Sequence, residues 1–279
     1  MAPHAILVLL GDDPPAAART HLAARLAVHL GAHVTGLAPT GRPHLDGSAS
    51  AAHALETAEA ARTGGWVRAQ QLADRFRSAA GAEGVVSVDA VAAGGPTLPL
   101  LLHHAGCHGL VVVSAPPQGD TTRRGGVHFL EQVLAANPRP TLVVPGDGRF
   151  DHAGRRVVFA WDDSPAAVRA ATDALTVLRR GSAVWLCAWR RAGDAAEDAV
   201  AARLHEVAAW LGRHGVVADC RVAQARGGVG DALLHDAAAL GADLVVMGTY
   251  GHAKWIERVT GGATRTVLRH ATLPLWMSH

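Results

Sequence analysis

The sequence predicts two tandem α/β domains, each a doubly wound, five-stranded, mostly parallel sheet flanked by helices. Two observations predict this fold. The chain repeats itself, because the segment ILVLLGDDPPAAAR at 6–19 is answered by RVVFAWDDSPAAVR at 156–169. Each half also alternates short apolar runs with longer amphipathic segments, which is typical of a parallel sheet covered by helices on both faces.

Two further pairs of segments repeat in the same order. LLHHAGCHGLVVVS at 101–114 is answered by LLHDAAALGADLVVMG at 233–248, and VLAANPRPTLVV at 133–144 by VLRHATLPLWMS at 267–278. Three matches in one order indicate a tandem duplication. We therefore expect domains at 1–146 and 155–279, related by pseudo-two-fold symmetry and joined by the polar, glycine-rich linker 145–154.

The second half begins with a strand that ends in Asp-Asp, followed by Ser164 and Pro165. Serine is a strong helix N-cap and proline suits the first helical position. The apolar periodicity continues the same alternation to the end of the chain. It predicts strands at 156–161, 183–188, 217–223, 243–248 and 275–278, and helices at 164–178, 195–214, 229–240 and 263–270.

The first half reads in the same way, and its run LVVV fits a strand buried on both faces. The predicted strands lie near 5–10, 33–38, 85–91, 109–114 and 141–145, and the predicted helices near 15–30, 51–81, 97–106 and 128–136.

Composition excludes several classes of protein. The formal charge of the 279 residues is only +2 and the basic residues do not cluster, so a nucleic-acid partner is not expected. Three scattered cysteines favour a reducing compartment over a disulfide scaffold. Neither a signal segment nor a membrane span is apparent, so we expect a soluble cytoplasmic protein. Lys254 is the only lysine, which excludes a P-loop and leaves it as the sole lysine for Schiff-base chemistry.

The loop after the predicted strand 243–248 has the chemistry of an anion site. Gly248 and Gly251 permit a tight turn out of the strand, and Gly261 and Gly262 lead into a helix. The first N–H groups of a helix have no intrahelical partner and, with the helix dipole, suit a phosphate. Thr264 would add a hydroxyl, and Arg265 and Lys254 would add charge.

The glycine spacing Gly248-x2-Gly251-x9-Gly261, together with Asp162 after the first strand of this half, resembles the universal stress protein family. The resemblance covers both halves, so the whole chain is similar to a tandem member. It implies a five-stranded α/β fold, and one branch of the family binds ATP. It also implies that the last strands of the two copies, 141–144 and 275–278, meet and so cover exposed sheet edges.

Carried over to this sequence, the resemblance implies a nucleotide site in the second half. Asp162 would face the nucleotide and Ala188 the adenine, and backbone groups would hold the ribose and phosphates. Where ATP-binding members have Ser or Thr, this chain has Gly262, and losing one neutral hydrogen bond costs about 0.5–1.5 kcal/mol. The residues of the predicted site are Asp162, Ala188, Met247, Gly248, Gly251, Gly261, Gly262, Ala263 and Thr264.

The first half lacks this loop, although Asp12 still matches Asp162. We expect that it binds no nucleotide and that Phe129, at a predicted helix start, would crowd a phosphate. The replaced positions, in the order of Gly248, Gly251, Gly261, Gly262 and Ala263, are Ser114, Pro117, Val127, His128 and Phe129.

Ordinary structural roles compete with these assignments. The loop glycines could be plain turn residues, and Asp162 could simply cap the helix beside Ser164. Gly227, Gly228 and Gly230 are best explained as a turn and a cap. Ser114 and Ser164 lack the context of a nucleophile elbow.

The remaining conspicuous side chains suggest no further site. His103, His104 and His108 lack the carboxylate or cysteine partners of a metal site, so we expect no metal there. The tryptophans in or beside strands are expected to be packing residues. These are Trp161, Trp185, Trp189 and Trp276.

The leading hypothesis is a stress-response protein that binds an adenine nucleotide, ATP first, with Mg²⁺ as an optional companion ion. No catalytic residue and no redox cofactor are expected, so any ATPase activity should be slow. The chain would be a pseudo-dimeric monomer or a homodimer, with its protein partner unknown. Two alternatives stay open: an interaction protein of the same fold without nucleotide, and an ATP-dependent ligase-like enzyme.

Overall fold

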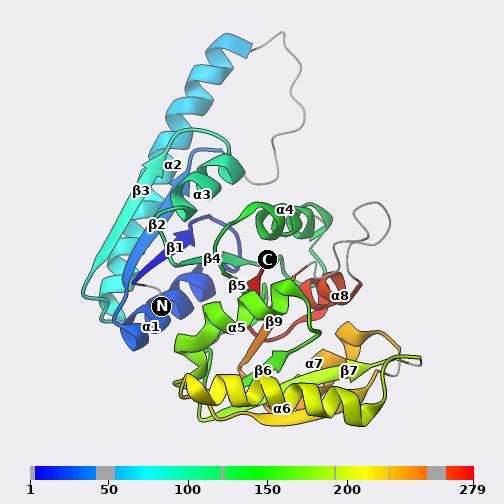
Figure 1. The fold of residues 1–279 in the computed structure, drawn as a ribbon. Helices are drawn as coiled ribbons and strands as arrows, with labels where there is room; N and C mark the ends of the chain where they lie inside the picture. The colour runs from blue at the N-terminus through cyan, green and yellow to red at the C-terminus, as the bar shows by residue number, and fades with distance from the viewer. Residues whose placement is uncertain (1–3, 42–53, 121–122, 192, 226, 250–261) are drawn as a thin grey trace. The chain divides into compact units, whose positions relative to one another are not determined.

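The computed structural model describes residues 4–41, 54–120, 123–191, 193–225, 227–249 and 262–279. The chain divides into two compact units. One contains residues 3–139 and 146–151, and the other contains residues 140–145 and 152–279. In the sequence of each half, strands and helices alternate as predicted (Figure 1).

The first unit is a parallel sheet in the order β3-β2-β1-β4. Because crossovers between parallel strands are right-handed, the reversal of direction at β1 places α1 and α2 on one face and α3 on the other. Accordingly α1 packs against α2, and α3 packs against α4. The elements are β1 (Ala5–Leu9), α1 (Ala16–Leu30), β2 (His33–Pro39), α2 (Ala54–Ala82), β3 (Val88–Ala93), α3 (Thr97–Ala105), β4 (Leu110–Ser114) and α4 (Arg123–Ala136).

The second unit contains the strand order β5-β10-β9-β6-β7-β8, in which all pairs are parallel except β5–β10. The closing strands of the two halves therefore pair, as predicted, with Leu142 opposite Trp276. The elements are β5 (Thr141–Val144), β6 (Arg156–Ala160), α5 (Pro165–Leu178), β7 (Ala183–Arg190), α6 (Glu197–Arg213), β8 (Asp219–Gln224), α7 (Val229–Ala239), β9 (Leu244–Gly248), α8 (Gly262–His270) and β10 (Leu275–Ser278).

Local signals in the sequence set the helix ends. Ser164 caps α5, where its Oγ accepts a hydrogen bond of 3.1 Å from the N–H of Ala167, and Pro165 follows at the first position. Gly31 ends α1 in the left-handed conformation, with φ of 64°. The fold class predicted from the sequence is confirmed, with strands and most helices within a few residues of their expected bounds.

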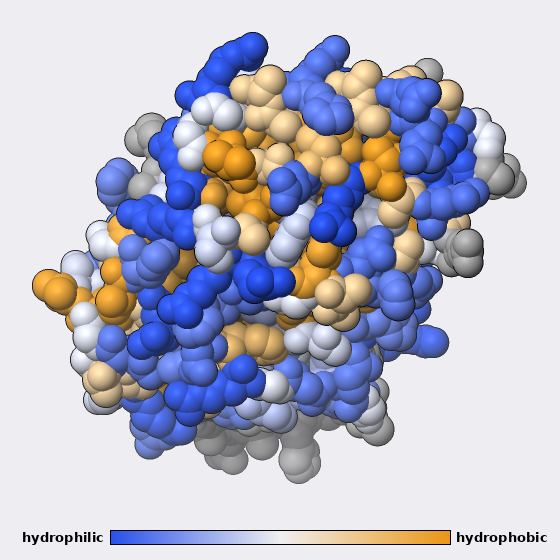
Figure 2. Space-filling view, turned by 90° about the horizontal axis from the view of Figure 1, so that it is seen from below, coloured by the Kyte–Doolittle hydropathy of each residue, from blue (hydrophilic) through white to orange (hydrophobic). Residues whose placement is uncertain are grey.

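The core of each unit lies on its central strands. Residues 6–8 of β1 and 245–246 of β9 are completely buried, as expected for parallel strands covered on both faces. On the face shown in Figure 2, apolar side chains form patches among hydrophilic ones. Isolated exposed apolar residues are normal for a folded protein. The large ones among the described residues are Val28, Trp66, Val67, Val86, Val168 and Val217.

One helix differs clearly from its prediction. We expected a helix at 128–136, but α4 already begins at Arg123. The sequence suggests a break at Gly125-Gly126, yet a Cβ on Gly126 would lie only 2.9 Å from Cγ of Pro116. The glycine allows the helix to approach the loop after β4, so tertiary contact outweighs its low helix propensity.

Candidate functional site

The sheet of the second unit reverses its strand order at β6, which lies between β7 and β9. At the end of β6, Ala160 pairs with Cys187 on one side and with Met247 on the other. In an open α/β sheet, ligands bind beyond the carboxyl ends of the strands at such a reversal. The predicted residues Asp162, Ala188 and Gly248 all lie at this edge of the sheet.

Packing leaves no room for a side chain at Gly248. A Cβ at this position would lie 2.5 Å from the amide nitrogen of Ala167 and 2.6 Å from the carbonyl carbon of Ala166. The first turn of α5 therefore lies directly against the end of β9. The sequence analysis explained Gly248 by its turn, whereas the structure shows that the close approach of two backbones also requires glycine.

Asp162 has the structural role that competed with ligand binding. Its Oδ1 accepts a hydrogen bond of 3.1 Å from the N–H of Ser164, the N-cap of α5. The residue is exposed at the carboxyl edge of the sheet. Asp162 thus shapes the turn into α5 and keeps a negatively charged group at the predicted site.

The neighbouring Asp163 is a feature that the sequence analysis missed. It is the only described non-glycine residue with positive φ, at 59°, a conformation that Asp tolerates better than most residues. Its Oδ1 accepts hydrogen bonds from Nε1 of Trp161 at 3.0 Å and from Nε of Arg203 at 2.7 Å. Asp163 and Glu206 together raise the pKa of Arg203. The signal available in the sequence was the repeated Asp-Asp pair.

Three further predicted residues are buried. Ala188 is 7% exposed, Met247 5% and Thr264 6%. Ala188 and Met247 lie near the ends of β7 and β9, so they form an apolar surface beside the carboxyl edge of the sheet. Thr264 lies in the first turn of α8, as the predicted site requires.

The start of α8 lies at the same edge of the sheet. Because β9 and β10 run parallel, the helix that connects them must begin at the carboxyl ends of the strands. The described helix begins at Gly262, and a Cβ added there would meet no atom of the described residues within 4 Å. Ala263 follows in its first turn, while Gly251, Lys254 and Gly261 lie outside the described residues.

The glycines before α7 have structural roles, in agreement with the turn-and-cap interpretation. Gly227 has φ of 95° and Gly228 is the N-cap. A Cβ on Gly230 would lie 2.8 Å from Cβ of Thr266 and 2.9 Å from the carbonyl oxygen of Ala263. Gly230 therefore lets α7 pack closely on α8.

The first unit has a pocket of ≈ 290 Å³ at the corresponding edge of its sheet. It is lined by the ends of β1, β2 and β4 and by α4, and Phe129 is among its lining residues. The prediction placed Phe129 at a helix start, which is wrong, because α4 begins at Arg123 and Phe129 lies in its second turn. The phenyl ring nevertheless narrows this pocket.

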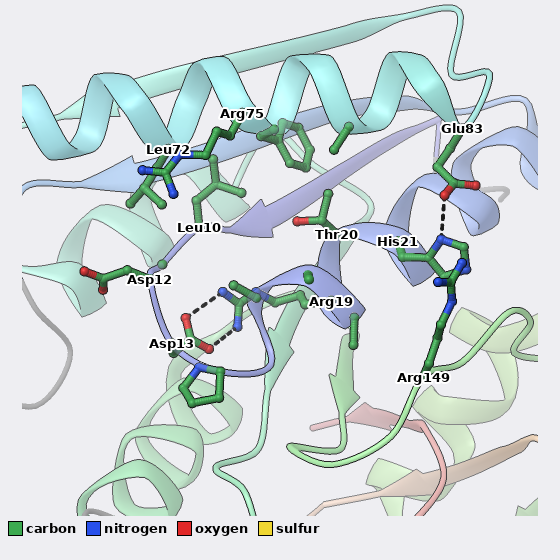
Figure 3. Close-up of a pocket in the computed structure, with 17 residues that line it drawn as sticks. Leu10, Asp12, Asp13, Arg19, Thr20, His21, Leu72, Arg75, Glu83 and Arg149 are labelled. Atoms are coloured by element: carbon green, nitrogen blue, oxygen red, sulfur yellow. Dashed lines mark hydrogen bonds and ion pairs between the residues drawn. The ribbon is translucent and has the colours of Figure 1, made fainter.

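An ion pair between the buried Arg19 and the half-buried Asp13 lies at this pocket. The guanidinium of Arg19 donates to both carboxylate oxygens of Asp13 at 2.8 and 2.9 Å (Figure 3). It also donates to Oγ of Ser114 at 3.0 Å. Arg19 is only 3% exposed. Such a bidentate pair is a strong form of hydrogen bonding. In the second half the equivalent Asp163 binds Arg203 instead, and Arg169, the counterpart of Arg19, is exposed.

A second pocket of the first unit, of ≈ 600 Å³, lies between α1 and α2 (Figure 3). Arg75, His21 and Arg149 are among its lining residues. Glu83, which also lines it, is 2.6 Å from Nδ1 of His21. No motif in the sequence indicated a site at this place.

The histidines near the end of α3 contact each other through the backbone. Nδ1 of His108 donates to the carbonyl oxygen of His104 at 2.7 Å, across the end of the helix at Ala105. Among the described residues, no group of three His, Cys, Asp or Glu side chains could hold a metal ion. In the same part of the chain, no helix is both long and apolar enough to cross a membrane.

Comparisons with known proteins agree with this architecture. The universal stress protein family model matches residues 154–279. A universal stress protein from Archaeoglobus fulgidus superimposes with a TM-score of 0.74 at 15% identity, covering 100% of this chain and 96% of that one. A functionally unknown protein from Pseudomonas aeruginosa gives a TM-score of 0.64 at 16% identity, covering 99% and 92%.

At these identities the two structures establish the fold. A comparison with curated protein sequences gave no significant match. Residues 154–279 are therefore a universal stress protein domain, and the chain as a whole has the two-domain fold of that family.

Proposed function

We propose that the second unit binds an adenine nucleotide, with ATP as the leading candidate, beyond the carboxyl ends of β6, β7 and β9. The observation that carries the proposal is the start of α8 at Gly262, where no atom of the described part of the chain lies within 4 Å of an added Cβ. The N–H groups of a first helical turn have no intrahelical partners and attract phosphate. The family match covers this half of the chain.

The surroundings support this assignment. Ala188 and Met247 offer apolar surface for a base, and Asp162 offers a carboxylate to hydroxyl groups of a ribose. The carboxylate of Asp162 would repel phosphates, so these groups belong at the other end of the ligand, beside α8. Mg²⁺ would accompany the phosphates, and the protein would act through binding with slow turnover at most.

The first unit would not bind the nucleotide. Ser114 occupies the position of Gly248, and Pro116 and Pro117 have no N–H to offer to a phosphate. The pairing of β5 with β10 supports a pseudo-dimeric monomer, and a homodimer of the tandem chain stays a prediction. A protein that acts through partners without a nucleotide is the alternative function.

Titration calorimetry with ATP, ADP and AMP tests the proposal. A serine at position 262 has room for its side chain and would restore one hydrogen bond, so Gly262→Ser should tighten ATP binding about 2- to 10-fold. The Gly251→Val, Gly261→Val double variant should remove binding.

His128→Ser is the matched control, because His128 occupies the position of Gly262 in the first half and its side chain is exposed. It should leave the affinity unchanged. Absence of heat with all three nucleotides would reject the nucleotide proposal in favour of a partner-binding protein.

A further inference from the structure

The linker between the halves is bound to the first unit. After β5, which belongs to the second unit, residues 146–151 group again with the first unit. Linkers rich in glycine and polar residues are usually flexible tethers. This one instead makes contacts at both of its ends, and each involves residues with a specific chemistry.

At its beginning the linker lies against the loop after β4. A Cβ on Gly146 would overlap the backbone nitrogen of Pro117 and the carbonyl carbon of Pro116. Only glycine permits this approach of two backbones. The two prolines also stiffen the loop that receives the linker.

The next residue supplies an anion to the same loop. Oδ2 of Asp147 accepts a hydrogen bond of 2.6 Å from the backbone N–H of Gln118. A carboxylate that accepts from a backbone amide makes a stronger bond than a neutral acceptor. In the repeat, this loop corresponds to the one that follows β9 and precedes α8 in the second unit.

At its end the linker is held by a histidine. Nε2 of His21 lies 2.8 Å from Oδ1 of Asp151, and Nδ1 lies 2.6 Å from Oε1 of Glu83. Ionised carboxylates only accept hydrogen bonds, so His21 can donate to both only as an imidazolium. Arg25 also donates to the carbonyl oxygen of Asp151 at 3.4 Å.

We infer that the loop after β4 is a docking site for the chain's own linker, and that the carboxylate of Asp147 takes the place of an external anion there. We call these two contacts of the linker the clasp: Asp147 with the N–H of Gln118 at its beginning, and Asp151 with His21 at its end. The comparison with an external anion rests on the site proposed in the second unit, whereas the contacts of the clasp are those of the first unit alone.

Amide hydrogen exchange of the intact chain tests the clasp. Asp147→Ala removes the acceptor for the N–H of Gln118, so exchange of that amide should accelerate about 2- to 10-fold, the equivalent of one hydrogen bond. Asp151→Ala should accelerate amide exchange around Asp151 and tryptic cleavage after Arg149. It should accelerate exchange of the Gln118 amide less than Asp147→Ala does.

Asp74→Ala is the control, because Asp74 is an exposed carboxylate of α2 that pairs with Arg77 and not with the linker. It should change neither readout. Equal exchange at Gln118 in the wild type and in Asp147→Ala would overturn the inference, as would cleavage after Arg149 that is unaffected by Asp151→Ala.

Acidification provides a second readout. The hydrogen bond from His21 lowers the pKa of Asp151. Burial raises this pKa by a smaller amount, and the charge of Arg149 lowers it further. Glu83, Arg25 and Arg149 are the other charged groups around this pair. The contact of Asp151 with His21 should therefore weaken as the pH falls through the lowered pKa of Asp151. Amide exchange at residues 149–151 that, corrected for its intrinsic pH dependence, is equally slow above and below this pKa would contradict it.

Discussion

Equivalent residues of the two halves have acquired different roles. Asp13 and Asp163 occupy the same position in the repeat, yet Asp13 pairs with the buried Arg19 whereas Asp163 binds Trp161 and the exposed Arg203. The sequence predicts the shared Asp-Asp turn but not these partners. Each carboxylate takes the donor that packing brings within reach, and Arg203 comes from a separate helix, 40 residues away.

Burial also sets the ionisation of the histidines at the end of α3. Desolvation lowers the pKa of His108. The hydrogen bond to the backbone of His104 raises this pKa by a smaller amount, and the nearby His33 lowers it. Desolvation likewise lowers the pKa of His104, with His103 and His108 adding to the effect. The folded protein therefore favours the neutral forms of both side chains.

This burial predicts a loss of stability in mild acid. Because the folded pKa of His108 lies below that of the unfolded chain, the unfolded state binds more protons as the pH falls. The contribution of His108 to the free energy of unfolding is therefore fully present above the pKa of the unfolded chain, ~6.5. It is lost as the pH falls through the pKa of His108 in the folded protein. The urea midpoint should decrease from pH 7.5 to pH 5.5, and less steeply in His108→Gln.

His205→Gln serves as the control, since His205 is an exposed residue of α6. This variant should retain the slope of the wild type. An identical slope in His108→Gln would show that His108 does not contribute to the acid sensitivity.

At the scale of elements, the sequence predicts each strand and helix but not their close approaches. The apolar periodicity and the Ser164-Pro165 cap place α5, and the alternation of strands and helices predicts a mostly parallel sheet in each half. The contact of α5 with Gly248 and that of α4 with Pro116 depend on packing between elements. For the same reason α4 extends through a Gly-Gly pair that local propensity reads as a break.

The approach of α5 to β9 makes Gly248→Ala a sensitive test. A Cβ would lie 2.5 Å from the amide nitrogen of Ala167, so the backbones must separate, at a cost of about 1–3 kcal/mol in the free energy of unfolding. Gly262→Ala adds the same methyl group in open space and should be neutral or slightly stabilising. Chemical denaturation of the two variants compares them, and equal stabilities would contradict the close approach.

At the scale of the whole molecule, the internal repeat predicts the duplicated fold and the pairing of β5 with β10. The compact units follow other bounds than the repeat, because β5 groups with the second unit and residues 146–151 with the first. The expected domains 1–146 and 155–279 describe the repeat in the sequence. The compact units depend on which surfaces the strand and the linker contact.

The candidate site could be predicted in part. The sequence locates Asp162, Ala188, Met247 and Gly248 at one edge of the sheet, where the structure places their elements. Thr264 lies in the first turn of α8 and is buried as a residue, and its contact with a ligand stays a prediction. The two halves therefore share one fold but are expected to differ in phosphate binding, which is proposed for the second half alone.

The most direct test of that asymmetry is the backbone amide NMR spectrum of the ¹⁵N-labelled chain during titration with ATP. The amides of Gly262 and Ala263 at the start of α8 should shift and become protected from exchange, whereas those of Gly125 and Gly126 in α4 should not change. Shifts confined to the first unit, or none in either helix, would contradict a phosphate site in the second unit.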